Sequence, residues 1–107
     1  MNQKHILISR TDKLGDVVLT LPLILILKKN YPDLRITFIG TSYTEPLLAC
    51  CPDIDAILTW DNIRLLSVEE QKKTFVELRA DVIIHVFPDK QIANITNAVN
   101  IPIRIGT

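Results

Sequence analysis

Hydrophobic residues occur in five short runs that are separated by longer, mixed segments. Several of these runs are nearly continuously apolar and do not alternate with polar residues. Strands of a parallel sheet have this pattern, because helices cover both faces of the sheet. The pattern predicts strands from His5 to Arg10, Arg35 to Gly40, Ala56 to Trp60, Asp81 to Phe87 and Ile101 to Gly106.

The segments between these runs carry helix signals. We expect helices from Asp16 to Asn30, from about Thr44 to Cys51, from Ser67 to about Arg79 and from Lys90 to about Val99. Pro22 removes one backbone donor from the first helix and predicts a bend or an irregular first turn there.

The third predicted helix has the clearest start. Ser67 and Glu70 have the spacing of a capping box. Its expected apolar face consists of Val68, Phe75, Val76 and Leu78.

The alternation of strands and helices is typical of an α/β domain built from βαβ units. We therefore predict one Rossmann-like domain over residues 1–107, with an open parallel sheet of about five strands, the first strand central, and helices on both faces. The last predicted strand has no following helix, which predicts an exposed apolar edge and either self-association or marginal stability of the isolated chain.

Composition restricts the partners. The 107 residues include 12 basic and 12 acidic side chains, so charge gives no reason to expect nucleic acid. The apolar run Val17 to Leu27 is shorter than the roughly 20 residues of a membrane span, and the first ten residues lack a signal-peptide pattern. We expect a cytoplasmic protein, with Cys50 and Cys51 as free thiols.

The turn from Thr11 to Gly15 is the first candidate site. Ligands of open parallel sheets bind beyond the carboxyl ends of the strands, and this turn follows the first strand. Gly15 would allow a sharp turn or the close approach of a ligand. Asp16 falls at the helix start as N-cap or first-turn residue, so that spacing alone leaves capping and catalysis both open.

Other candidate motifs have simpler explanations. The turn has one glycine where a dinucleotide fingerprint needs three. The acidic segment 53–55 precedes the third strand, at the opposite edge of the sheet, and is predicted to be a turn. We expect His85 to be a buried, hydrogen-bonded histidine, His5 to lie at the opposite edge, and Trp60 to serve packing.

The sequence "ILISRTDKLGDVVLTLPLILILKKNYPDLRITFIG" resembles the opening of family nine glycosyltransferases, the ADP-heptose:lipopolysaccharide heptosyltransferases. Later, "DVIIHVF" and "NIPIRIGT" are similar to that family's fourth strand and its Arg-Ile-Gly segment. The resemblance implies a two-domain GT-B fold. This chain would be part of the N-terminal, acceptor-side domain, without the C-terminal nucleotide-sugar domain, and we expect it to be inactive by itself.

The resemblance also implies a site. Asp16 would be the catalytic base of an inverting transfer, with Arg10 and Lys13 contacting anionic groups of the acceptor and Thr11 and Gly15 completing the acceptor site. The expected donor is ADP-heptose, used as a substrate, and the expected acceptor is of the lipopolysaccharide-core type. No metal or cofactor is expected. The acceptor implies peripheral contact with the inner membrane.

Two other functions fit parts of the pattern. A signalling receiver domain has a similar length and acidic residues after its first and third strands, here Asp12, Asp16 and Asp61. A non-catalytic fragment or assembly module would keep the fold without the chemistry.

Overall fold

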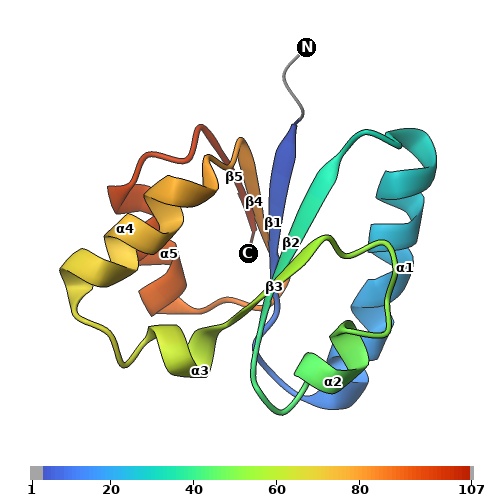
Figure 1. Ribbon diagram of the computed structural model, residues 1–107, viewed down its shortest axis with the longest axis horizontal. Helices are drawn as coiled ribbons and strands as arrows, with labels where there is room; N and C mark the ends of the chain where they lie inside the picture. Colours follow the sequence, from blue (N-terminus) through green and yellow to red (C-terminus); the bar gives the residue numbers. More distant parts are fainter. Residues whose placement is uncertain (1–3, 107) are drawn as a thin grey trace.

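The computed structural model describes residues 4–106 (Figure 1). Residues 1–3 and Thr107 lie outside the described residues. Residues 1–3 are part of the ten-residue segment in which no signal-peptide pattern was found. The elements in chain order are β1 (His5–Ser9), α1 (Leu14–Asn30), β2 (Arg35–Gly40), α2 (Glu45–Leu48), β3 (Ala56–Thr59), α3 (Trp60–Ile63), α4 (Val68–Leu78), β4 (Val82–His85), α5 (Lys90–Ala98) and β5 (Ile103–Gly106). None of the helices formed by residues 4–106 combines the length and apolar character that a membrane-crossing segment needs.

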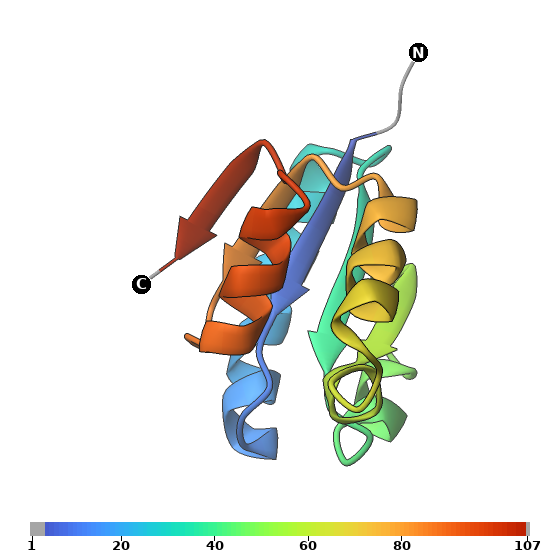
Figure 2. The ribbon, with the colours of Figure 1, turned by 90° about the vertical axis from the view of Figure 1, so that its left-hand side faces the viewer.

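The strands form one five-stranded sheet in which all neighbouring strands are parallel. Their order is β3-β2-β1-β4-β5, so the first strand is central, as predicted. The strand arrows in Figure 2 point the same way, and their carboxyl ends lie at one edge, which we call the carboxyl rim. The predicted open parallel sheet is therefore confirmed.

Helices cover both faces of the sheet, with α1 and α2 on one side and α3, α4 and α5 on the other (Figure 1). Ile8 and Phe38 are buried on the α1 face, while Leu7 and Ile39 are buried on the α4 face. Successive strand residues point to opposite faces, so both sets are buried. This two-sided burial explains why the strands read as continuous apolar runs.

Apolar surface is exposed on α1 and at the edge strand β5. Leu19 and Leu25 of α1 are 76% and 59% exposed, and Ile103 and Ile105 of β5 are each 52% exposed. A helix that is apolar on nearly all sides is typical of an element with neighbours on more than one side. Self-association through this surface stays a prediction.

The first helix begins two residues earlier than predicted. Lys13 is its N-cap residue, and Asp16 is therefore in the first turn and is not the N-cap. Gly15 lies inside the helix without a positive φ, and a Cβ built there would meet no atom within 4 Å. The prediction that Gly15 makes a sharp turn is wrong, because the turn is completed before it. The helix continues through Pro22 to Asn30.

Other boundaries also differ from the predictions. The second helix is a single turn, Glu45–Leu48, because the chain turns at Ala49 and the cysteines. The third strand ends at Thr59, because Trp60 begins the short helix α3, which was not predicted. β4 is also shorter than predicted, α5 ends at Ala98, and β5 begins only after Pro102, which has no N–H to donate.

The third predicted helix has the predicted cap but a different buried face. The Ser67 hydroxyl accepts from the backbone N–H three residues later, at 3.2 Å. Val68 and Val76 are each 56% exposed, so their assignment to the apolar face is wrong. Gln71 is buried instead, beside Phe75, because its amide donates to two carbonyls of the α3–α4 loop.

Two aspartates tie the amino ends of the strands together. Asp55 immediately precedes β3, and its Oδ2 accepts from the backbone N–H of Ile36 and from Lys28 Nζ, both at 2.8 Å. Asp81 precedes β4 in the same way, and its Oδ2 accepts from the backbone N–H of His5 at 2.9 Å. Each aspartate therefore satisfies a backbone donor of the neighbouring strand.

Replacing Asp55 by alanine is expected to lower the free energy of unfolding by about 1–3 kcal/mol, since the Ile36 N–H loses its acceptor. Burial opposes ionisation of Asp55, but the hydrogen bonds from Lys28 and Ile36 outweigh it and lower its pKa. The stabilisation is therefore present above the unfolded-state pKa and is lost as pH falls through the lower folded-state pKa. Urea unfolding at neutral and acidic pH measures both effects.

The control for this variant is Asp53→Ala in the same loop, which we expect to change stability by at most about 0.5 kcal/mol. An Asp55→Ala protein as stable as the parent at neutral pH would contradict the proposed role of the carboxylate.

Candidate functional site

The first strand ends in the middle of the carboxyl rim. Its neighbours there are β2 on one side and β4 on the other, so the strand order reverses between β1 and β4. Such a reversal is the switch point at which open α/β sheets bind ligands. Residues 10–13 connect β1 to α1 at this point, and we call them the rim turn. The structure therefore places the turn at the predicted edge of the sheet.

Arg10 holds together two aspartates of this region. Its Nε lies 2.9 Å from Asp12 Oδ1, and its Nη2 donates to Asp12 Oδ2 at 3.1 Å. The same Nη2 lies 3.6 Å from Asp16 Oδ1. The side chains of Arg10 and Asp12 are 18% and 13% exposed, whereas that of Asp16 is 40% exposed. The guanidinium therefore orients both carboxylates, and Asp16 presents the more accessible one.

The remaining predicted residues lie close by in different settings. Thr11 is half-buried, while Lys13 and Gly15 are exposed. Lys13 makes no ion pair with any of residues 4–106. The structure thus brings Arg10 together with Asp12 and Asp16 and leaves the Lys13 ammonium without an ion pair among residues 4–106.

Two buried polar atoms lie at the switch point without a protein partner. Ser9 and His85 are the last residues of β1 and β4 and lie side by side in the sheet. Ser9 Oγ and His85 Nδ1 make no hydrogen bond to any part of the described chain. Burial lowers the pKa of His85, an effect that Arg104 reinforces and Asp89 opposes. Unpaired buried polar atoms are uncommon in folded proteins, and a bound ligand is one reason for them.

A small hollow of about 270 Å³ lies beside the rim turn, and we call it the rim hollow. Its lining comes from the segments that follow β1, β2, β3 and β4: Thr11, Thr41, Trp60, Asp61, Arg64, Asp89 and Gln91. The side chains are mainly polar, and both signs of charge are present. The hollow can therefore hydrogen-bond a hydroxyl-rich molecule next to the rim turn.

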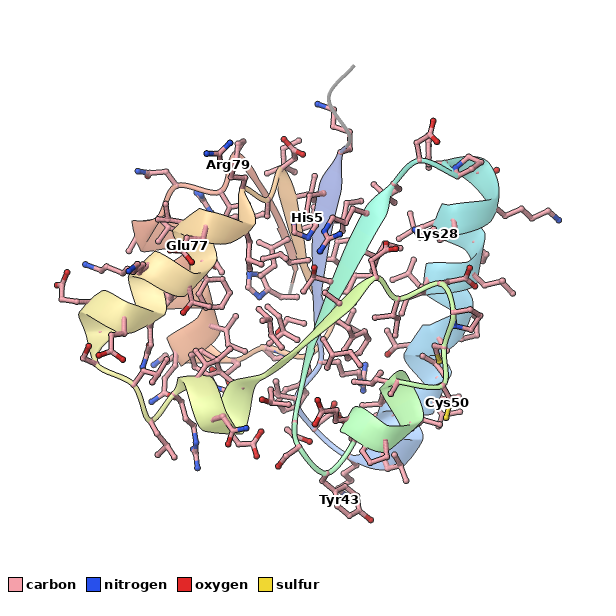
Figure 3. All side chains as sticks on the ribbon, viewed as in Figure 1. His5, Lys28, Tyr43, Cys50, Glu77 and Arg79 are labelled. Atoms are coloured by element: carbon pink, nitrogen blue, oxygen red, sulfur yellow. The ribbon has the colours of Figure 1, made fainter. Side chains whose placement is uncertain are left out.

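The loop after β2 contributes to this region, although the sequence analysis assigned it no role. The Ser42 backbone N–H and hydroxyl both donate to the Asp61 carboxylate, and these hydrogen bonds lower the pKa of Asp61. Tyr43 of the same loop points away from the body of the molecule (Figure 3). Polar residues that follow the ends of strands, such as Ser42 and Arg64, were the signal that could have identified this part of the rim.

The remaining candidates of the sequence analysis have structural roles. His5 lies between the sheet and α4 (Figure 3), and its ring nitrogens contact Leu78 O at 2.8 Å and Thr37 Oγ1 at 2.7 Å. Trp60 is buried, as predicted, with its ring 6.4 Å from that of Phe75.

Three further predictions have mixed outcomes. Cys50 and Cys51 are free thiols, as predicted, and burial is the main cause that raises the pKa of Cys51. The acidic segment 53–55 is confirmed as part of the turn before β3. The prediction of a hydrogen-bonded His85 is wrong for its Nδ1, because its neighbour on β5 is Gly106, which has no side chain to serve as a partner.

The strand order contradicts the receiver-domain alternative. Receiver domains have the order 2-1-3-4-5, in which the third strand lies next to the first. Here β4 occupies that place and β3 lies at the far edge. Asp61, which follows β3, is therefore separated from the rim turn by the end of β2, and its carboxylate is bound to Ser42. The acidic triad of a receiver is not assembled.

Known proteins are similar to this chain in sequence. No family model matches it. A putative glycosyltransferase of Haemophilus influenzae is 42% identical over 55 residues, which are 51% of this chain and 16% of that protein. Lipopolysaccharide heptosyltransferase 3 of Escherichia coli is 32% identical over 98 residues, which are 86% of this chain and 29% of that protein. The chain thus spans less than a third of the length of these relatives.

Solved structures share the fold. A family 9 glycosyltransferase of Veillonella parvula superposes with a TM-score of 0.80 at 23% identity, over 97% of this chain and 31% of that one. The ADP-heptose lipopolysaccharide heptosyltransferase II of E. coli gives 0.79 at 20% identity, over 97% and 30%. An E. coli heptosyltransferase with ADP gives 0.76 at 14% identity, over 96% and 34%. The sequence relatives and the shared fold together confirm the resemblance of this chain to glycosyltransferase family nine, over a segment that makes up about a third of those structures.

Proposed function

We propose that this chain is the acceptor-side part of a glycosyltransferase that moves a sugar from a nucleotide-sugar donor to a hydroxyl of a lipopolysaccharide-core acceptor. The observation that carries this proposal is the placement of Asp16, an accessible carboxylate at the switch point of the sheet. The similarity to lipopolysaccharide heptosyltransferase 3 supports the acceptor class. The similar folds of an ADP-heptose heptosyltransferase and of a heptosyltransferase with ADP support ADP-heptose as donor.

In the proposed reaction the acceptor oxygen attacks the anomeric carbon of the donor sugar. The bond between that carbon and the diphosphate oxygen breaks, the anomeric configuration inverts, and the nucleotide leaves as a diphosphate. The proton of the acceptor hydroxyl passes to Asp16. Asp16 lies in the first turn of α1 with its Oδ1 3.6 Å from Arg10 Nη2, and its side chain is 40% exposed, so the carboxylate is held at the rim and can be reached by an acceptor hydroxyl.

The residues predicted for the acceptor site have separate roles in this proposal. Arg10 positions Asp16, because its guanidinium is shared between the carboxylates of Asp12 and Asp16. Arg10 is therefore less free to contact the acceptor than predicted from the sequence. Lys13 is the cation of the turn that contacts an anionic group of the acceptor. Thr11 offers a hydroxyl to the rim hollow, and Gly15 leaves space beside Asp16. The reaction is proposed to need no metal or cofactor.

The donor site is proposed to lie in a second domain of a GT-B protein. The solved structures with this fold are about three times as long as the chain, which supports this division. The protein is proposed to act in the cytoplasm, with peripheral contact to the inner membrane.

The test is an assay with ADP-heptose and a lipopolysaccharide core that lacks its terminal heptose. The two-domain protein containing this chain is expected to add one heptose, detected as a mass increase of the acceptor, while the 107 residues alone are expected to add none. UDP-glucose serves as the control donor. The absence of transfer from ADP-heptose and from other nucleotide sugars would contradict the proposal and favour the non-catalytic assembly module.

A further inference from the structure

A second hollow, of about 470 Å³, opens between α5 and the edge strand β5. We call it the α5–β5 hollow, and its polar lining residues and one glycine are His85, Asp89, Lys90, Asn94, Asn97, Arg104 and Gly106. None of the sites expected from the sequence includes these residues. Its volume is in the range of small-molecule sites.

The sheet register brings the strand residues of this hollow to one face. Arg104 lies beside Ile83, which is buried on the α5 side, and Gly106 lies beside His85. A Cβ on residue 106 would come within 2.7 Å of His85 Cβ and 3.1 Å of its carbonyl oxygen. Glycine therefore lets the end of β5 lie against His85 and keeps the base of the hollow open.

The polar groups of the hollow have unused bonding capacity. Lys90 and Arg104 make no ion pair within residues 4–106, and the Asn94 and Asn97 amides donate and accept no hydrogen bond there. Arg104 donates one hydrogen bond to the carbonyl of Ile101, and its other N–H groups remain available. His85 Nδ1 is buried without a partner.

The charge in the hollow favours an anion. Its one carboxylate belongs to Asp89, and Asp89 Oδ1 already caps α5 by accepting from the backbone N–H groups of Gln91 and Ile92. Two cations, two amides and an imidazole therefore face one carboxylate with a structural role. Cations recognise phosphate or carboxylate, and amides and imidazole recognise hydroxyls.

The lining also argues against a packed protein element as the occupant. A helix that packed here would remove two cations and two amides from water without giving them partners, which is costly. A nucleobase is disfavoured as well, because no aromatic side chain other than the His85 imidazole lines the hollow. A small, hydroxylated anion satisfies the lining best.

The α5–β5 hollow adjoins the rim hollow, because Asp89 lines both. Thr11 of the rim turn also lines the rim hollow. We propose that the α5–β5 hollow binds an anionic sugar unit of the acceptor, adjacent to the unit whose hydroxyl reacts at Asp16. The statement that this ligand is part of an acceptor rests on the proposed function. It assigns Lys90 and Arg104 the anion contacts that Arg10 cannot make while it is bound to two aspartates.

Binding is tested on the 107-residue chain by NMR titration, with glucose 6-phosphate and glucuronate as separate probes for phosphate and carboxylate. At least one is expected to cause saturable shifts of the backbone signals of His85, Asn94 and Gly106. Arg104→Gln and Lys90→Gln should each weaken that binding about tenfold, since each removes a charge-assisted contact. Lys29→Gln, at the far end of α1, should leave it unchanged.

Two comparisons separate a built site from an adventitious one. Glucose without a charge should bind much more weakly, and inorganic phosphate should bind more weakly than the sugar phosphate. Equal affinity for inorganic phosphate, or shifts that avoid these residues, would overturn the proposal. Lys90→Gln decides the matter if Arg104→Gln unfolds through loss of its bond to Ile101. The titration contains no sugar donor and is independent of the transfer assay. If a probe binds here but the two-domain protein transfers no heptose, only the transferase proposal is refuted.

Discussion

Asp16→Asn is expected to reduce sugar transfer by about 10²–10⁴-fold in the two-domain protein, because asparagine cannot accept a proton. The fold should persist. Asp16 is in the first turn of α1 and is not the N-cap, its side chain makes no capping hydrogen bond, and asparagine has nearly the same shape. The measurement is the turnover rate with saturating donor and acceptor, beside a thermal melt of each protein. Loss of turnover with an unchanged melting temperature is the expected result.

The matched control is Asp33→Asn, which removes the same charge from the exposed loop before β2, at the opposite edge of the sheet. It should leave turnover unchanged. Asp12 is not a suitable control, because its nearly buried carboxylate pairs with Arg10 and its loss would release the guanidinium toward Asp16. Near-normal turnover of Asp16→Asn would make Asp16 a structural first-turn aspartate and would remove the catalytic assignment.

The sheet was predictable because its burial pattern is simple. Strands buried on both faces form apolar runs that need no periodicity to be recognised, and β1 and β2 were located within a residue. Short helices were not predictable in the same way. The four residues of α3 are too few to show a helical period, and they follow a strand without a polar break. Gln71 was not included in the predicted buried face of α4, because its burial depends on the conformation of the preceding loop, whose carbonyls at Arg64 and Leu66 accept from its amide.

The candidate site was predictable only in part. A polar turn after a central strand is visible in the sequence, and Asp16 was selected from it. The pairing of Arg10 with two aspartates depends on side-chain geometry that spacing does not determine. The rim hollow and the α5–β5 hollow combine residues from segments that are far apart in sequence, such as Thr11 and Asp89 or His85 and Arg104. Their adjacency follows from the strand order, which the alternation of elements does not specify.

Phe75→Ala is expected to lower the free energy of unfolding by about 3–5 kcal/mol, the usual cost of emptying a large buried aromatic site. Phe75 is 1% exposed, packs with Leu7 and Ile83 in the core on the α4 face, and has its ring 6.4 Å from that of Trp60. Domains of this size are stable by only about 5–15 kcal/mol. The substitution should therefore remove a large part of the total, measured as a lower midpoint of urea unfolding with an unchanged slope.

The neighbouring Val76 provides the control, because the helix register decides the contrast between the two positions. Val76 is 56% exposed, and Val76→Ala is expected to change stability by at most about 0.5 kcal/mol, since it loses little packing and gains helix propensity. Phe75→Leu should cost less than Phe75→Ala, because it keeps more of the buried volume. Similar losses for Phe75→Ala and Val76→Ala would contradict the register of α4, in which Gln71 and Phe75 face the core, and would favour the apolar face that includes Val76.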